Sequence, residues 1–103
     1  MIFSNWRRLT ENEVRMAKQV FADGIDFSRI KIYRGIPFLP NHNTAIAPNG
    51  NIYFPRKHCP DDFTKAGIAY KIWLIHELTH VWQHQRGHKV WLSGLLIMLK
   101  GGY

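Results

Sequence analysis

The chain has 103 residues, a length that suits one small domain with a modest core and excludes two. Hydrophobic residues make up 46% of the chain, which excludes a disordered protein, and the single cysteine, Cys59, excludes an intrachain disulfide or a cysteine-rich zinc knuckle. The net charge of +7 indicates an acidic partner, but the basic residues are dispersed and no nucleic-acid recognition motif accompanies them. We therefore expect no specific nucleic-acid partner.

Neither the N-terminus nor the apolar stretch from 90 to 99 has the pattern of a targeting or membrane-spanning segment. The N-terminus lacks the basic-then-apolar order of a secretory signal, so we expect synthesis in the cytoplasm. The apolar stretch from 90 to 99 is shorter than the roughly 20 residues that span a bilayer. Its simplest interpretation is a core element, and the alternative is a segment that a partner chain or a second copy of the protein covers.

A helix is predicted from residue 11 to residue 23. Thr10 and Glu13 have the spacing of a capping box, in which the hydroxyl and the carboxylate each accept a backbone N–H of the other residue. Apolar residues then recur at helical spacing, and Gly24 is typical of a C-terminal stop.

A short strand and a hairpin are predicted next. Polar and apolar residues alternate from 30 to 34, and Gly35 ends this strand. Asn49 and Gly50 then suit a type I′ turn between two further strands. The residues that suit those strands are Ile46, Ile52 and Phe54.

A long helix is predicted from residue 61 to residue 85, followed by Gly87 as its stop. Asp61 and Asp62 would lie in its first turn, where acidic side chains suit the helix dipole. Nearly every direction around this helix is apolar between residues 67 and 82, which predicts a central, buried helix.

This helix contains the sequence His-Glu-x-x-His, formed by His76, Glu77 and His80. Residues four apart share one helix face, so both imidazoles can bind one zinc ion. Glu77 is rotated about 100° from His76, which suits contact with a metal-bound water better than ligation. A metal lowers the pKa of such a water, and a glutamate general base then takes its proton before attack on a carbonyl.

The motif has a competing interpretation, in which the histidines are satisfied core residues and Glu77 pairs with a neighbouring base. With this composition, His-Glu-x-x-His is expected by chance only about 0.01 times in such a chain. An ionised glutamate within an apolar helix is also costly unless a positive charge compensates it. Both considerations favour the metal site.

The sequences "LTENEVRMAKQVFADGIDFSRIKIYR", "APNGNIYFP" and "LIHELTHVWQHQRG" resemble the small Vgr-related zincin-like proteins of bacteria that carry type VI secretion systems. They resemble, more distantly, the His-Glu-x-x-His domain of extracellular contractile injection systems. The resemblance covers nearly the whole chain. It implies a zincin-like metallopeptidase with His76 and His80 as metal ligands and Glu77 as catalytic base, encoded near or delivered by a contractile secretion machine.

The resemblance also implies a later helix rich in Glu and Gln that supplies a third, acidic ligand, whereas this sequence has no Asp or Glu after Glu77. The metzincin position for a third histidine is Arg86, which excludes that arrangement. Water, a loop residue or a separate polypeptide could complete the site. The other candidate ligands are His42, His58, Cys59, Asp61, His84 and His88, of which His84 lies about 6 Å further along the helix axis than His80 and cannot easily close the site.

From these observations we expect residues 1–103 to form a single small zincin-like α+β domain, lacking the family's C-terminal helix, with an N-terminal helix, a short β-hairpin or sheet and a central motif helix. The expected function is a zinc metallopeptidase, with Zn²⁺ as cofactor, a protein or peptide substrate and delivery as a type VI secretion effector. An immunity protein or a secretion-machine protein is the expected partner. The alternative is a non-catalytic adaptor of the secretion machinery. Aromatic residues near the hairpin are expected at the substrate edge: Phe38, Tyr53 and Phe54.

Overall fold

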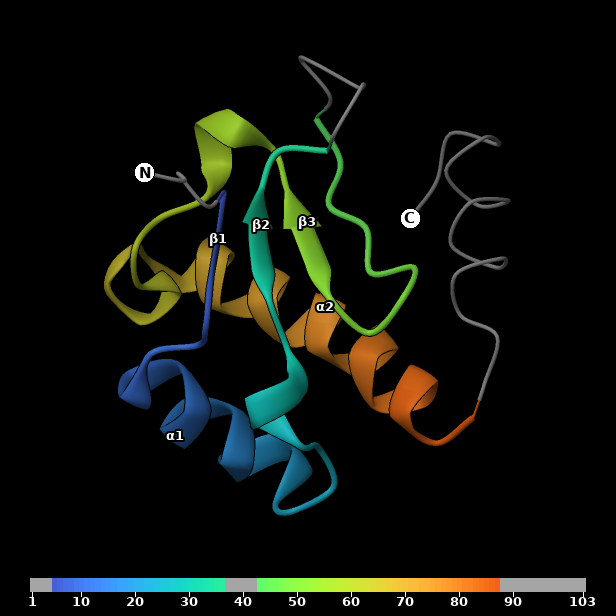
Figure 1. Ribbon diagram of the computed structural model, residues 1–103. Helices are drawn as coiled ribbons and strands as arrows, with labels where there is room; N and C mark the ends of the chain where they lie inside the picture. The colour runs from blue at the N-terminus through green and yellow to red at the C-terminus, as the bar shows by residue number, and fades with distance from the viewer. Residues whose placement is uncertain (1–4, 37–42, 88–103) are drawn as a thin grey trace.

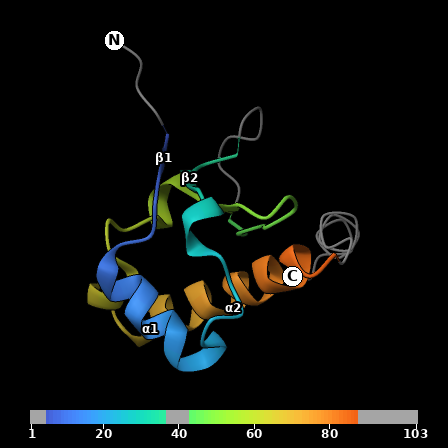
Figure 2. The same ribbon diagram turned by 60° about the horizontal axis from the view of Figure 1, so that its bottom comes forward.

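The chain folds into one layer of strands packed on one layer of helices (Figures 1 and 2). The computed structural model describes residues 5–36 and 43–87. In these ranges the strands are β1 (Trp6–Arg7), β2 (Ile32–Arg34) and β3 (Ile52–Phe54), and the helices are α1 (Glu11–Phe21) and α2 (Ile68–Gln85). Three short 3₁₀ turns connect them: η1 (Phe27–Arg29), η2 (Arg56–His58) and η3 (Phe63–Lys65). The predicted α+β class is confirmed.

The sheet is mixed, with strand order β1-β2-β3. β1 pairs antiparallel with β2, β2 pairs parallel with β3, and Ile46 forms an antiparallel bridge to Tyr53 on the far side of β3. In Figure 1, α2 crosses behind all three strands. The segment that contains Ile46 is thereby held at the edge of the sheet, beside the motif helix.

The predicted hairpin forms only in part: Ile52 and Phe54 lie in β3, but Ile46 makes a single bridge and no strand, and the turn is not of the two-residue type I′. Ile46 and Tyr53 exchange two backbone hydrogen bonds of 3.0 and 2.8 Å, which leaves a longer loop between them. Within this loop the Asn49 side chain accepts a hydrogen bond from the Asn51 N–H, and Gly50 has a φ of 84°. The side-chain turn at Asn49 competes with the tighter backbone turn and widens the loop.

The first helix is capped as predicted, although it ends earlier. The Glu13 N–H donates to Thr10 Oγ1 at 3.1 Å, and the Thr10 N–H donates to Glu13 Oε1 at 2.9 Å. Helix α1 ends at Phe21, two residues before the predicted end, because Ala22 leaves helical geometry with a φ of 50°. The second strand begins later than predicted, since Asp26 caps the 3₁₀ turn that precedes it.

Glu13 also joins three parts of the fold. Its carboxylate is fully buried and accepts two hydrogen bonds from the Arg7 guanidinium of β1, at 2.8 and 2.9 Å. The same carboxylate accepts the Phe63 N–H of η3 at 2.8 Å. One buried side chain therefore ties β1 and α1 to the turn that leads into the motif helix.

The motif helix starts later than the sequence indicates. α2 begins at Ile68, so the predicted helical start at residue 61 is wrong. Asp62 instead caps η3, where it accepts hydrogen bonds from the Thr64 N–H and hydroxyl at 2.9 and 2.7 Å. Gly67, with a φ of 107°, then separates this turn from the helix. Gly87, with a φ of 91°, follows the helix as predicted.

Only one face of α2 is buried, which corrects the expectation of a helix buried all round. Leu74, Leu78 and Val81 are fully buried against the sheet, whereas Ile68 and Ile72 are 70% and 62% exposed. In a two-layer fold a helix has one packed face. The core lies between this face and the inward side chains of the sheet: Ile32, Ile52 and Phe54, with Ala17, Ile30 and Phe63 around them.

Several predictions concern residues outside the described ranges. These are the predictions for Phe38, His42, His88 and the apolar stretch 90–99. In residues 5–36 and 43–87, neither helix is both long and apolar enough to cross a membrane.

Candidate functional site

Helix α2 brings the two motif histidines together on one face. The rings of His76 and His80 have centroids 5.1 Å apart and planes inclined at 80°. This separation follows from the rise of about 6 Å over four helical residues. Two imidazoles so placed can offer nitrogen donors to one metal ion, as the sequence predicts.

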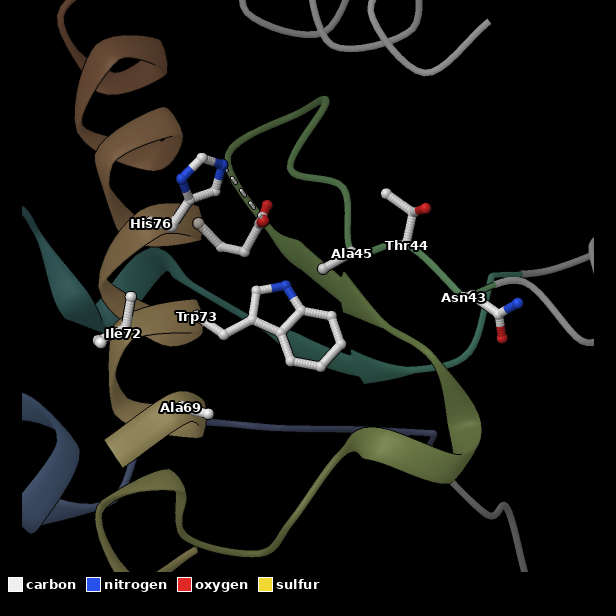
Figure 3. A pocket seen from close by; sticks show the side chains of 8 residues that line it. Asn43, Thr44, Ala45, Ala69, Ile72, Trp73 and His76 are labelled. Carbon is white, nitrogen blue, oxygen red and sulfur yellow. Dashed lines mark ion pairs between the residues drawn. The ribbon is translucent and has the colours of Figure 1, made fainter. Parts of the chain in front are cut away.

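Glu77 lies at the base of the same site. Its side chain is 1% exposed, whereas that of His76 is 48% exposed. The Glu77 Oε2 atom is 3.9 Å from His76 Nε2, the contact drawn as a dashed line in Figure 3. The arrangement therefore sets a shielded carboxylate beside an imidazole that solvent reaches.

Gln83 orients the second histidine. The Nδ1–H of His80 donates to Gln83 Oε1 at 3.2 Å, which fixes the tautomer and leaves Nε2 as the nitrogen with a lone pair. Burial lowers the pKa of His80 below its usual value, and the neighbouring His76 lowers it further. A neutral imidazole whose other nitrogen is hydrogen-bonded is the form that binds metals.

A cleft of about 440 Å³ opens over His76 and Glu77 (Figure 3). One wall is α2, which contributes the Trp73 indole below His76. The opposite wall is the segment before the Ile46 bridge, which contributes Thr44 and Ala45. The complete lining is Asn43, Thr44, Ala45, Ala69, Ile72, Trp73, His76 and Glu77.

Among the described residues, the aromatic side chain that lines this cleft is not one of those predicted. Phe54 is fully buried and packs edge-on against Trp73 with centroids 5.2 Å apart, and Tyr53 stacks on Tyr33 at 4.6 Å. Neither of these two lines the cleft. Trp73 does, and its position three residues before His76, on the same helical face, is the signal that identifies it in the sequence.

Among the described residues, three further candidate ligands lie elsewhere: His58, Asp61 and His84. The His84 ring packs against the hairpin loop, where a Cβ on Gly50 would lie 2.7 Å from its Cδ2 atom. His58 shares a hydrogen bond of 2.9 Å with the Tyr70 hydroxyl, and Asp61 pairs with Arg34. In the part of the chain that the structure describes, no group of three His, Cys, Asp or Glu side chains could hold a metal.

The two imidazoles and the carboxylate among the described residues match part of the donor set of an open zinc site. Catalytic zinc combines protein ligands with a position for water or substrate, and two imidazoles beside a shielded carboxylate supply part of such a set. Half-exposed His76 gives access from the cleft, and Gln83 holds His80 from behind. The described residues thus offer two candidate ligands, His76 and His80, and one candidate base, Glu77.

No family model matches the chain. The chain is 40% identical over 91 residues to the type VI secretion system spike protein VgrG2b of Pseudomonas aeruginosa, an alignment that covers 85% of this chain and 9% of that protein. A solved structure, the effector domain of Pseudomonas aeruginosa VgrG2b, is 32% identical and superposes with a TM-score of 0.75 over 94% of this chain and 58% of the other. The chain is thus related in sequence and fold to a type VI secretion effector domain, and it spans a small part of the spike protein.

Proposed function

We propose that this chain is a zinc-dependent metallopeptidase that acts as an effector linked to type VI secretion. The observation that carries the enzymatic part is the buried Glu77 carboxylate beside the half-exposed His76, at the floor of an open cleft. A carboxylate held away from solvent within reach of a substrate cleft suits a general base better than a structural ion pair.

His76 and His80 would hold the zinc ion. Zinc supplies Lewis acidity, which makes a water molecule easier to deprotonate and a carbonyl easier to attack. Glu77 would accept the proton of the attacking water and later deliver a proton to the nitrogen of the departing amine. Gln83 positions His80 through the hydrogen bond to Nδ1.

The shape of the cleft favours an extended peptide as substrate. It lies between the exposed side of α2 and the Asn43–Ala45 segment, which continues into the Ile46 bridge at the sheet edge. Extended chains bind well along sheet edges, since both partners offer backbone donors and acceptors at matching intervals. Trp73 would contact the peptide with its indole.

The secretion part of the proposal rests on similarity. The related solved structure is described as an effector domain, and the related whole protein is described as a spike protein of the type VI system. Delivery by that system, action on a protein or peptide target, and association with a secretion-machine or immunity protein are therefore proposed for this chain.

The experiment is a comparison of purified full-length protein with its Glu77→Gln variant. Bound zinc is measured by mass spectrometry, and hydrolysis is measured on a mixed pool of protein-derived peptides and peptidoglycan stem peptides. We expect Glu77→Gln to retain zinc and to lose hydrolysis by about 10²- to 10⁴-fold, the usual contribution of general-base catalysis. His80→Ala should lose zinc as well. Glu11→Gln removes an exposed glutamate and serves as the matched control that should change neither.

Two results would contradict the proposal. Equal hydrolysis by wild-type protein and Glu77→Gln would show that another group is the base or that a contaminant acts. Zinc retained by the wild-type protein without hydrolysis of any peptide in the pool would instead support a non-catalytic adaptor with a structural metal site.

A further inference from the structure

A second cavity, of about 350 Å³, lies where α2 begins. Its lining has three cationic side chains, Arg34, Arg56 and Lys57, and no acidic one among the described residues. The polar hydroxyl of Tyr70 also lines it. We call these lining residues and the space they enclose the basic cavity.

The positive charge of the basic cavity is only partly compensated. Arg34 forms an ion pair of 3.2 Å with Asp61, whose side chain is 96% exposed. Arg56 and Lys57 form no ion pair with any residue in 5–36 or 43–87. Cys59 also lines the cavity, and burial raises the pKa of its thiol, so it adds no negative charge at neutral pH.

One of these cations lies against the end of a strand. Gly35 has a φ of 93°, and a Cβ built there would meet the Arg56 guanidinium at 3.5 Å. Such a distance is an ordinary van der Waals contact, so the guanidinium lies against the end of β2, at the residue that follows Arg34. Two guanidinium groups and an ammonium thereby line one cavity, a combination that suits a carboxylate.

Three rings lie between the basic cavity and the cleft over His76 and Glu77. Trp73 lines the cleft, and its ring lies 6.1 Å from that of Tyr70, which lines the basic cavity. The His58 ring lies 6.2 Å from that of Trp73 and shares a hydrogen bond with Tyr70. These three rings form the wall between the two spaces. A ligand would reach both spaces only by extending over this wall of rings.

We propose that the basic cavity is a specificity subsite that binds a carboxylate of the peptide held in the cleft over His76 and Glu77. This inference rests on the proposed peptidase function. Tyr70 and His76 are six residues apart, about 9 Å along the helix axis, and an extended peptide advances about 3.3 Å per residue. The acidic residue of the substrate therefore lies two or three residues from the bond that is cleaved.

The test uses binding, so that it does not depend on turnover. The full-length Glu77→Gln protein is titrated with fluorescein-labelled peptides in which one glutamate is moved along an otherwise neutral sequence, with glutamine at that position as reference. We expect anisotropy to show tighter binding by about three- to tenfold at one or two adjacent positions, a range set by partly exposed ion pairs. The double variant Arg56→Gln/Lys57→Gln should abolish this preference.

A matched control removes the same charge elsewhere. Arg15 and Arg29 are exposed, on α1 and η1, so Arg15→Gln/Arg29→Gln lowers the net charge equally and should keep the preference. An equal loss in both double variants would overturn the subsite in favour of diffuse attraction. Binding that is independent of glutamate position would also overturn it, and so would tighter binding of a single-stranded oligonucleotide of equal charge.

Each of the two proposals can be refuted without refuting the other. If wild-type protein hydrolyses neutral and acidic peptides at equal rates, the subsite is overturned while the peptidase stands. If the wild-type protein hydrolyses no peptide while position-dependent binding is still measured, the peptidase is overturned and the basic cavity stands as an acidic-peptide site.

Discussion

Replacing Glu13 by glutamine should destabilise the whole domain, although Glu13 lies far from the motif in sequence. Each carboxylate oxygen accepts two hydrogen bonds: Oε1 from Arg7 and the Thr10 N–H, and Oε2 from Arg7 and the Phe63 N–H. A glutamine keeps the shape but replaces one oxygen by an NH₂ group. Whichever way the amide turns, two donors lose their acceptor and the Arg7 charge loses its partner.

The size of the effect follows from burial. Breaking a buried ion pair by removing one partner costs about 3–5 kcal/mol. Because Arg7 is 23% exposed and water can partly solvate it, we expect about 2–4 kcal/mol for Glu13→Gln. A domain of this length has a free energy of unfolding of about 5–15 kcal/mol, so Glu13→Gln should remove a large share of that free energy.

The assay is urea unfolding followed by circular dichroism, with thermal unfolding in parallel. The midpoint should fall without a change in slope, and Tm should fall by roughly 10–25 °C. Glu11→Gln, which removes an exposed glutamate from the same first turn of α1, should cost less than about 0.5 kcal/mol. A loss below about 1 kcal/mol in Glu13→Gln, or equal losses in the two variants, would refute the role assigned to this buried carboxylate.

Two further variants test the surroundings of the site. Gly50→Ala should destabilise the domain by roughly 1–3 kcal/mol more than Gly87→Ala. Both glycines have positive φ, but only at Gly50 would the new Cβ meet the His84 ring, at 2.7 Å. Equal losses in urea unfolding would contradict this contact. Gln83→Leu should weaken zinc binding by about 10- to 100-fold in a chelator competition, because it removes the hydrogen bond that orients His80. Unchanged affinity would show that His80 needs no such support or binds no zinc.

The local elements were largely predictable from the sequence. The capping box of Thr10 and Glu13, the strand end at Gly35 and the helix end at Gly87 all depend on residues within a few positions of one another. The placement of His76 and His80 on one helix face is of the same kind, since it follows from helical periodicity alone. Short-range geometry was sufficient for each.

Only the tertiary structure decided which faces are buried and which distant residues meet. The apolar pattern of α2 indicated burial all round, but a two-layer fold offers one packed face, and Ile72 at the cleft is exposed. α2 begins at residue 68 and not at the predicted residue 61, because Asp62 caps a separate turn. Nothing near Glu13 in the sequence shows that its carboxylate also binds the Phe63 N–H, 50 residues away.

Some features of the site follow from the sequence, and others follow only from the tertiary structure. The sequence by itself determined the two histidines, the glutamate and their spacing, since one helix carries all three. The tertiary structure alone placed the Asn43–Ala45 segment opposite Trp73 and the basic cavity beside it, through pairing at the sheet edge and packing of rings from separate elements. The geometry of a helical motif follows from local periodicity. A cleft depends on contacts between distant segments, which periodicity does not encode.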